Sequence, residues 1–276
     1  MSQSLPFFIL LVLSLLLTVF ILWRKSNKRL LFLFLFIGGL AHLLDFFIMF
    51  ILNSYVYKPH FVQHHYYDNM LGSLVSQTFV YPTAALIVVA YNWSIFRVFL
   101  LSFLFMGIET LFLSLDVYEH FWWKTFYTGI FMFIGFLIAK KWYEGMNKGD
   151  ESKWRNFLTL YFVVFVISGI GISLITVFTS LNTLSTDFFS DGEREQIILT
   201  TIYIGIVNFL YSMSVVYSTN SLYTYGLLCI ICAVSYSLIM LNILEIAAVY
   251  KLLSICLYNV IVLIIIKSIH NRLLFL

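Results

Sequence analysis

The stretch LLFLFLFIGGLAHLLDFFIMFIL, residues 30–52, decides the fold. It is almost entirely apolar, and its two ionisable residues are His42 and Asp45. A helix needs about 20 such residues to cross the hydrocarbon core of a bilayer. The stretch therefore predicts a membrane-spanning helix that carries two ionisable side chains at bilayer depth.

The composition extends this prediction to the whole chain. Of its 276 residues, 62% are hydrophobic and 11% are charged, with a mean hydropathy of +0.96. Soluble domains average roughly 45–50% apolar and about 25% charged residues. We therefore expect the lipid bilayer to be the main partner. The net charge of +3 comes from short basic clusters between apolar runs, so we expect no nucleic-acid binding.

Apolar runs of helical length recur along the chain and predict an all-α, polytopic integral membrane helix bundle. Such continuous runs are not the alternating pattern of membrane strands. We expect about nine transmembrane helices, at residues 5–23, 30–52, 70–91, 95–115, 121–142, 156–180, 196–217, 222–241 and 247–267.

The positions of the basic residues predict the orientation. With the N-terminus outside, four of the sixteen Lys and Arg residues fall in outer segments and the other twelve fall inside. Cytoplasmic loops carry such an excess of positive charge, so we expect N-out and C-in. The cytoplasmic loop 144–155 then separates a five-span front half, 1–143, from a four-span back half, 156–276. No convincing internal repeat is visible in the sequence. The four outer basic residues are Lys58, Lys124, Arg194 and Lys251.

Polar side chains inside the front half predict a pocket. His42 and Asp45 share a helical face, and Glu109 on the fourth span lies at a similar depth to Asp45 when both are counted inward. Such groups are costly in a membrane and usually face a protein interior or a water-filled cavity. We expect an outward-facing polar pocket whose candidate residues are His42, Asp45, Asp68, Gln77, Glu109 and His120.

Three interpretations of these residues stay open. The first is a transporter-like or solute-binding protein that takes a small polar solute, an ion or protons. The second is a membrane-embedded enzyme, with or without a metal ion, and the third is an accessory protein whose polar groups only join helices. The sequence contains no HExxH, nucleophile or phosphate-loop motif, so no catalytic residue or cofactor is predicted. The metal candidates are His64, His65, Asp68, Asp116 and Glu119.

Two segments carry a resemblance to a known group of proteins. They are DNMLGSLVSQTFVYP at 68–82 and IETLFLSLDVYEHFWWKTFYT at 108–128. In these segments the chain resembles a family of small multi-pass membrane proteins of Bacillus-like and clostridial spore-forming bacteria. The resemblance covers roughly residues 30–143. It implies a bacterial plasma membrane and no particular activity, with Glu109, His120 and Trp123 as the family's core pattern.

Overall fold

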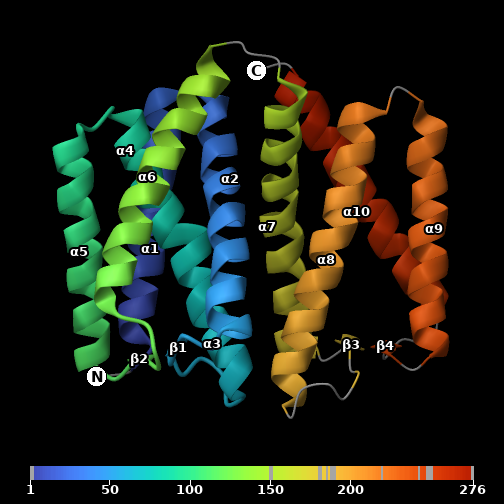
Figure 1. Cartoon of the computed structure of the whole chain (residues 1–276), viewed down its shortest axis with the longest axis horizontal. Coiled ribbons are helices and arrows are strands. Elements are labelled where there is room, and N and C mark those ends of the chain that lie inside the picture. Colours follow the sequence, from blue (N-terminus) through green and yellow to red (C-terminus); the bar gives the residue numbers. More distant parts are fainter. Residues whose placement is uncertain are drawn as a thin grey trace. The chain divides into compact units, whose positions relative to one another are not determined.

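The computed structural model describes residues 3–148, 152–179, 182–184, 186, 191–218, 220–241, 243–246 and 251–274. The chain divides into two compact units, residues 1–150 and 151–276, and each is described by itself. Both consist of long helices with one pair of very short antiparallel strands (Figure 1).

Unit 1 contains five helical rods. Two of them include a π-helical segment, η1 or η2, in which the turns are wider than in an α-helix. In chain order the elements are α1 (Leu5–Lys25), α2 (Lys28–Asp45) with η1 (Phe46–Ile51), β1 (Tyr55–Tyr57), α3 (His65–Leu74) with η2 (Val75–Val80) and α4 (Tyr81–Ala90), α5 (Ile95–Ser114), β2 (Tyr118–His120) and α6 (Thr125–Asn147).

The part of unit 2 that the structure describes forms four helical rods. Its elements are α7 (Lys153–Thr179), β3 (Asn182–Leu184), α8 (Gly192–Tyr217), α9 (Ser221–Met240), β4 (Leu244–Ile246) and α10 (Lys251–Leu274).

Polar residues at the chain's turns set where several helices begin. The side chain of Asn27 accepts a hydrogen bond from the backbone N–H of Arg29, and Asp191 accepts from Glu193 and Arg194. Asn220 does the same for Leu222 at the start of α9. Each cap satisfies a backbone donor that the first turn of a helix leaves free.

The predicted all-α membrane bundle is confirmed. In the described part of the chain, eight helices are long and apolar enough to cross a membrane. The ninth rod, α6, is 23 residues long but carries Lys140, Lys141 and Glu144 near its end and is not among the eight. Helix α6 also extends to Asn147, so the first part of the predicted loop 144–155 is helical. Residues 247–250, where the last predicted span begins, lie outside the described residues.

The two units share one order of elements, a repeat that the sequence did not reveal. Four helical rods and two strands of unit 1 recur in unit 2 in the order helix, strand, helix, helix, strand and helix, whereas α1 has no counterpart among the described residues of unit 2. The equivalent elements start 125 to 127 residues apart: Lys28 and Lys153, Tyr55 and Asn182, His65 and Gly192, Ile95 and Ser221, Tyr118 and Leu244, Thr125 and Lys251.

The strand pairs reproduce the repeat in detail. Both pairs are antiparallel and three residues long, with Val56 opposite Glu119 in one and Thr183 opposite Glu245 in the other. The repeat is therefore visible in the structural elements although none is visible in the sequence. The reason is that the repeated elements keep their lengths and order while most of their residues differ.

Helices of unit 1 are joined at both ends. At the end opposite the strands, Asn27 donates to the Tyr143 hydroxyl at 2.9 Å, and the Phe36 ring stacks on Trp142 with centroids 4.2 Å apart. At the strand end, the carbonyl of Ser54 accepts from the backbone N–H groups of Phe121 and Trp123. Helix α6 therefore runs the whole length of the unit, from the strands to the start of α2.

Candidate functional site

A cavity of about 370 Å³ lies inside unit 1, between α2, η2, α5, α6 and the two strands. Asp45, Gln77 and Glu109 all line it. The structure thus brings together three of the six predicted pocket residues from three different rods. Asp45 and Glu109 are almost completely buried, at 4% and 9% exposure.

Asp45 is held by three neutral donors. Its Oδ1 accepts from the Tyr55 hydroxyl and from Gln77 Nε2 at 3.2 Å, and its Oδ2 accepts from Ser73 Oγ at 2.5 Å. These partners come from β1, α3 and η2, so the carboxylate joins α2 to the strand and to the next rod. Among the described residues, no Lys, Arg or His is paired with Asp45.

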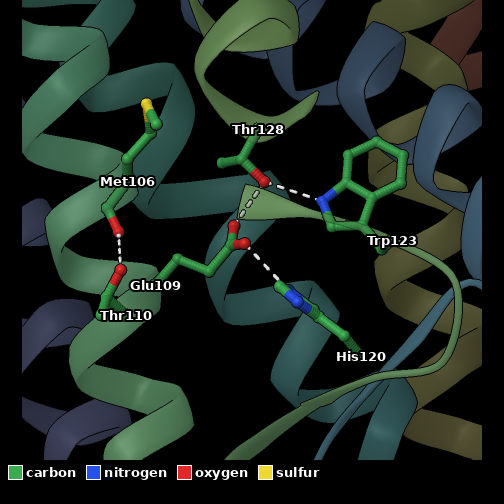
Figure 2. Close-up of polar contacts among 6 residues, drawn as sticks. All are labelled: Met106, Glu109, Thr110, His120, Trp123 and Thr128. Atoms are coloured by element: carbon green, nitrogen blue, oxygen red, sulfur yellow. Dashed lines mark hydrogen bonds and ion pairs between the residues drawn. The ribbon is translucent and has the colours of Figure 1, made fainter. Parts of the chain in front are cut away.

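Glu109 is the centre of a second polar group, drawn in Figure 2. Thr128 Oγ1 donates to its Oε2, and the Thr128 oxygen accepts from Trp123 Nε1 at 2.8 Å. His120 Nε2 lies 2.9 Å from Glu109 Oε1 as an ion pair if the imidazole is protonated. Both atoms are buried, and this contact is not aligned as a hydrogen bond.

The strands supply an aromatic wall at this end of the cavity. Tyr55 and Tyr57 of β1, Tyr118 of β2 and Trp123 all line it, and Tyr57 and Tyr118 lie with ring centroids 4.9 Å apart. Burial raises the pKa of the Tyr57 and Tyr118 hydroxyls, and the nearby carboxylates raise it further. These two hydroxyls therefore stay protonated. The pKa of the Tyr55 hydroxyl is raised by burial and by Asp45, so this hydroxyl also keeps its proton and donates a hydrogen bond to Asp45.

The rest of the cavity is apolar, which differs from the polar pocket that we expected. Aliphatic and aromatic side chains of α2, α5 and α6 make up most of its lining. Four of them are also exposed: Leu44 at 44%, Phe131 at 48%, Ile134 at 48% and Ile138 at 38%. Exposed apolar side chains of a membrane-spanning helix are expected to face lipid, so we expect this side of the cavity, between α2 and α6, to border the bilayer.

Three of the predicted pocket residues do not line the cavity. His120 is not part of the lining, but it contacts two lining residues, Glu109 and Tyr118. His42 lies outside it, and its buried Nδ1 has no hydrogen-bond partner in the described part of the chain. Asp68 has a structural position instead: its carboxylate accepts from the backbone N–H groups of His60, Phe61 and Val62 at 2.6 to 3.2 Å.

The predicted metal candidates do not converge. His64 precedes α3 and His65 is its first residue, with their rings against Tyr67 and Tyr66. Asp116 and Glu119 form ion pairs with Lys58, at 3.6 and 2.5 Å, and raise its pKa. Within the residues that the structure describes, no three His, Cys, Asp or Glu side chains are grouped to hold a metal ion.

Sequence reasoning missed several residues of the site. Tyr55 and Tyr118 lie in the two short strands, whose pairing brings them to the cavity, and Thr128 lies in the first turn of α6, beside Glu109. The π-helical segments were also missed, although η1 begins directly after Asp45 and η2 contains Gln77. Such wide turns are frequent at functional sites, because they redirect side chains within a helix.

The repeat separates architectural from site-specific polar residues. Asp68 and Asn69 correspond to Glu195 and Gln196, which are also buried, and Glu195 likewise accepts from loop atoms, the backbone N–H and hydroxyl of Thr186. Both units therefore have an acidic residue at this position, because the loop before the helix needs a hydrogen-bond acceptor in each.

The polar residues of the cavity, in contrast, have no polar counterpart of the same type in unit 2. At the positions equivalent to Gln77, Glu109 and His120, unit 2 has Ile204, Ser235 and Ile246. The counterpart of Asp45 falls within residues 170–172, which read Ile-Gly-Ile. The charged groups of the cavity are therefore not required by the repeated architecture, which is evidence that they serve the site itself.

The fold and the site define a multi-pass helical membrane protein with a buried, doubly acidic cavity in its first unit. Comparison with protein-family models, with curated proteins and with solved structures finds no match for this chain.

Proposed function

We propose that the first unit binds a small solute in this cavity, as a transporter-like or solute-binding membrane protein. The observation that carries the proposal is that Asp45, Gln77 and Glu109 line one cavity, whereas unit 2 has no acid or amide at the equivalent positions. A volume of about 370 Å³ lies within the ~300–1,000 Å³ typical of small-molecule sites. Internal repeats are also common among transporters, which supports the class by analogy.

The contacts argue against the enzyme alternative. In unit 1 the Thr128 hydroxyl donates to Glu109 and its oxygen accepts from Trp123 Nε1, so this hydroxyl is used in holding the cavity wall. A nucleophile needs an oxygen that is free to attack a substrate. The accessory alternative has one observation in its favour, because the three hydrogen bonds of Asp45 tie three segments together.

A cavity-blocking variant separates solute binding from helix joining. Ala41 lines the cavity and is 6% exposed, so Ala41→Phe fills part of the space without removing a polar contact. We expect members of a solute panel to raise the thermal unfolding midpoint of the purified wild-type protein and to have little effect on Ala41→Phe. If no solute distinguishes the two proteins, the cavity is only a packing defect.

The resemblance to membrane proteins of spore-forming bacteria extends the proposal to a bacterial plasma membrane, with the N-terminus outside. The basic residues of unit 1 support this orientation, since Arg24, Lys25, Lys28 and Arg29 lie at the end opposite the strands. Membrane fractionation of a native host is the direct test of this location.

A further inference from the structure

We propose that the solute is an amphiphilic organic cation, with an ammonium head between Asp45 and Glu109 and an apolar body along α2 and α6. This inference rests on the proposed function and adds the chemical class of the ligand. Three features of the cavity carry it: its charge, its aromatic wall and its border with lipid.

The charge of the cavity is unbalanced. The described residues that line it include two carboxylates and no Lys, Arg or His. Glu109 has His120 beside it, but Asp45 has only the neutral donors Tyr55, Ser73 and Gln77. A buried carboxylate is costly unless it is paired or loses its charge. A positively charged ligand supplies the missing partner.

The aromatic wall selects the kind of cation. The rings of Tyr55, Tyr57, Tyr118 and Trp123 surround the acidic end of the cavity. Aromatic faces attract ammonium groups, and cages of such rings recognise quaternary ammonium ligands. A transition-metal site is usually built from several His, Cys, Asp or Glu side chains, and the described residues contain no group of three of these.

The border with lipid indicates an apolar body. Leu44, Phe131 and Ile134 line the cavity and are also exposed on the face between α2 and α6. These helices are held together at the opposite end, by the Phe36–Trp142 stack, and α6 leans away from α2 toward the strands (Figure 1). A ligand with a hydrocarbon chain therefore has a route from the bilayer to the carboxylates.

A zwitterionic lipid is a poorer fit than a simple alkylammonium. A phosphocholine or phosphoethanolamine head carries a phosphate next to its ammonium group, and that phosphate would lie near two carboxylates. Like charges repel strongly at low dielectric. The volume of about 370 Å³ also favours one short chain over a whole two-chain lipid.

The test compares four single-chain probes on the full-length protein in neutral maltoside micelles. The probes are decyltrimethylammonium, decylphosphocholine, decanoate and decanol, and the readouts are the unfolding midpoint and the stoichiometry by native mass spectrometry. We expect saturable, one-to-one binding of decyltrimethylammonium at concentrations at least tenfold lower than for the other three.

Neutral isosteres show whether the carboxylates carry the selectivity. Asp45→Asn and Glu109→Gln keep the size of each side chain and can still hydrogen-bond the adjoining hydroxyls. We expect each to raise the dissociation constant of decyltrimethylammonium more than tenfold. The control is Asp116→Asn, which removes the same charge from a side chain that is 81% exposed and lies outside the cavity, and which should bind normally.

The experiments distinguish failure of the cationic ligand class from failure of the proposed solute-binding function. If decanoate, decanol or decylphosphocholine binds as tightly as the cation, and Ala41→Phe blocks that binding, the cavity is a solute site but the cationic class is wrong. Unchanged affinity of decyltrimethylammonium in Asp45→Asn and Glu109→Gln also overturns the class. If no probe binds and no solute of the wider panel distinguishes Ala41→Phe from the wild type, both the cationic class and the proposed solute-binding function are wrong.

Discussion

Two buried carboxylates of unit 1 have opposite kinds of surroundings. Asp68 accepts three backbone N–H groups of one loop, so each of its contacts fixes the course of the chain. Asp45 instead accepts from side chains alone, and two of its three donors, Tyr55 and Gln77, also line the cavity. At the residue scale, the type of donor therefore separates a structural acid from a candidate binding acid.

This difference predicts how the protein responds to Asp68→Asn. The amide cannot accept on both of its atoms, so at least one loop N–H loses its partner and the charge-assisted bonds weaken. We expect the free energy of unfolding to fall by about 1–3 kcal/mol. Asp116→Asn is the matched control, because its exposed ion pair with Lys58 is worth about 0–1 kcal/mol. Equal losses for the two variants, measured by reversible denaturation in mixed micelles, would contradict the structural assignment of Asp68.

Depth counting along the sequence placed Asp45 and Glu109 at a similar level, because the rise of a helix is fixed, and both line the cavity. His42, at a similar depth, does not line it. Sequence distance gives the depth of a helical residue, but it does not give the rotation of one rod against its neighbours or the path of a loop.

The β1–β2 pair is the smallest element of unit 1 and the one that completes the cavity. Its three-residue strands bring Tyr55, Tyr57 and Tyr118 against the carboxylates. Gly72 of α3 makes this possible, since a Cβ there would lie 2.5 Å from Tyr57 Cβ. Strands this short have no distinctive sequence pattern, which is why only the long helical elements were predicted.

Gly72→Ala is therefore expected to displace β1. Overpacking of this kind costs about 1–3 kcal/mol, and the movement of Tyr55 and Tyr57 should also weaken ligand binding at the cavity. Gly107 in α5 provides the control, because nothing lies within 4 Å of a Cβ at that position. Gly107→Ala should leave binding intact and stabilise the helix by about 0.5–1 kcal/mol. A Gly72→Ala protein with normal stability and binding would show that β1 does not need this close approach.

At the scale of the whole molecule, the repeat explains why the chain is longer than its site requires. Unit 2 keeps the element order, the strand register and the acidic loop acceptor, but it has Ile204 and Ser235 in place of Gln77 and Glu109. A comparison of residues along the sequence could not find this repeat, because a membrane helix is specified by general apolarity and many different residues meet that requirement.

The orientation of both units depends on whether α6 crosses the bilayer. Helix α6 spans unit 1 from Thr128 at the cavity to Tyr143 beside Asn27, so we expect it to cross in spite of Lys140 and Lys141. Lys140 donates to the Trp93 carbonyl at 2.6 Å, and long basic side chains at a helix end reach the interface easily. With α6 and α7 both crossing, the loops before β2 and after β3 fall on the same side of the membrane.

Single cysteines test this topology in intact cells that express a variant without Cys229, Cys232 and Cys256. Cysteine at Asp116 and at Gly192 should react with a membrane-impermeant maleimide from outside, because two spans separate these sites. Cysteine at Lys148, one span after Asp116, should react only after permeabilisation. If α6 does not cross, Lys148 joins Asp116 on the outer side and Gly192 moves to the inner side. The pattern of the three labels thus decides between nine crossings and eight, and with nine it places the acidic end of the cavity toward the outer face.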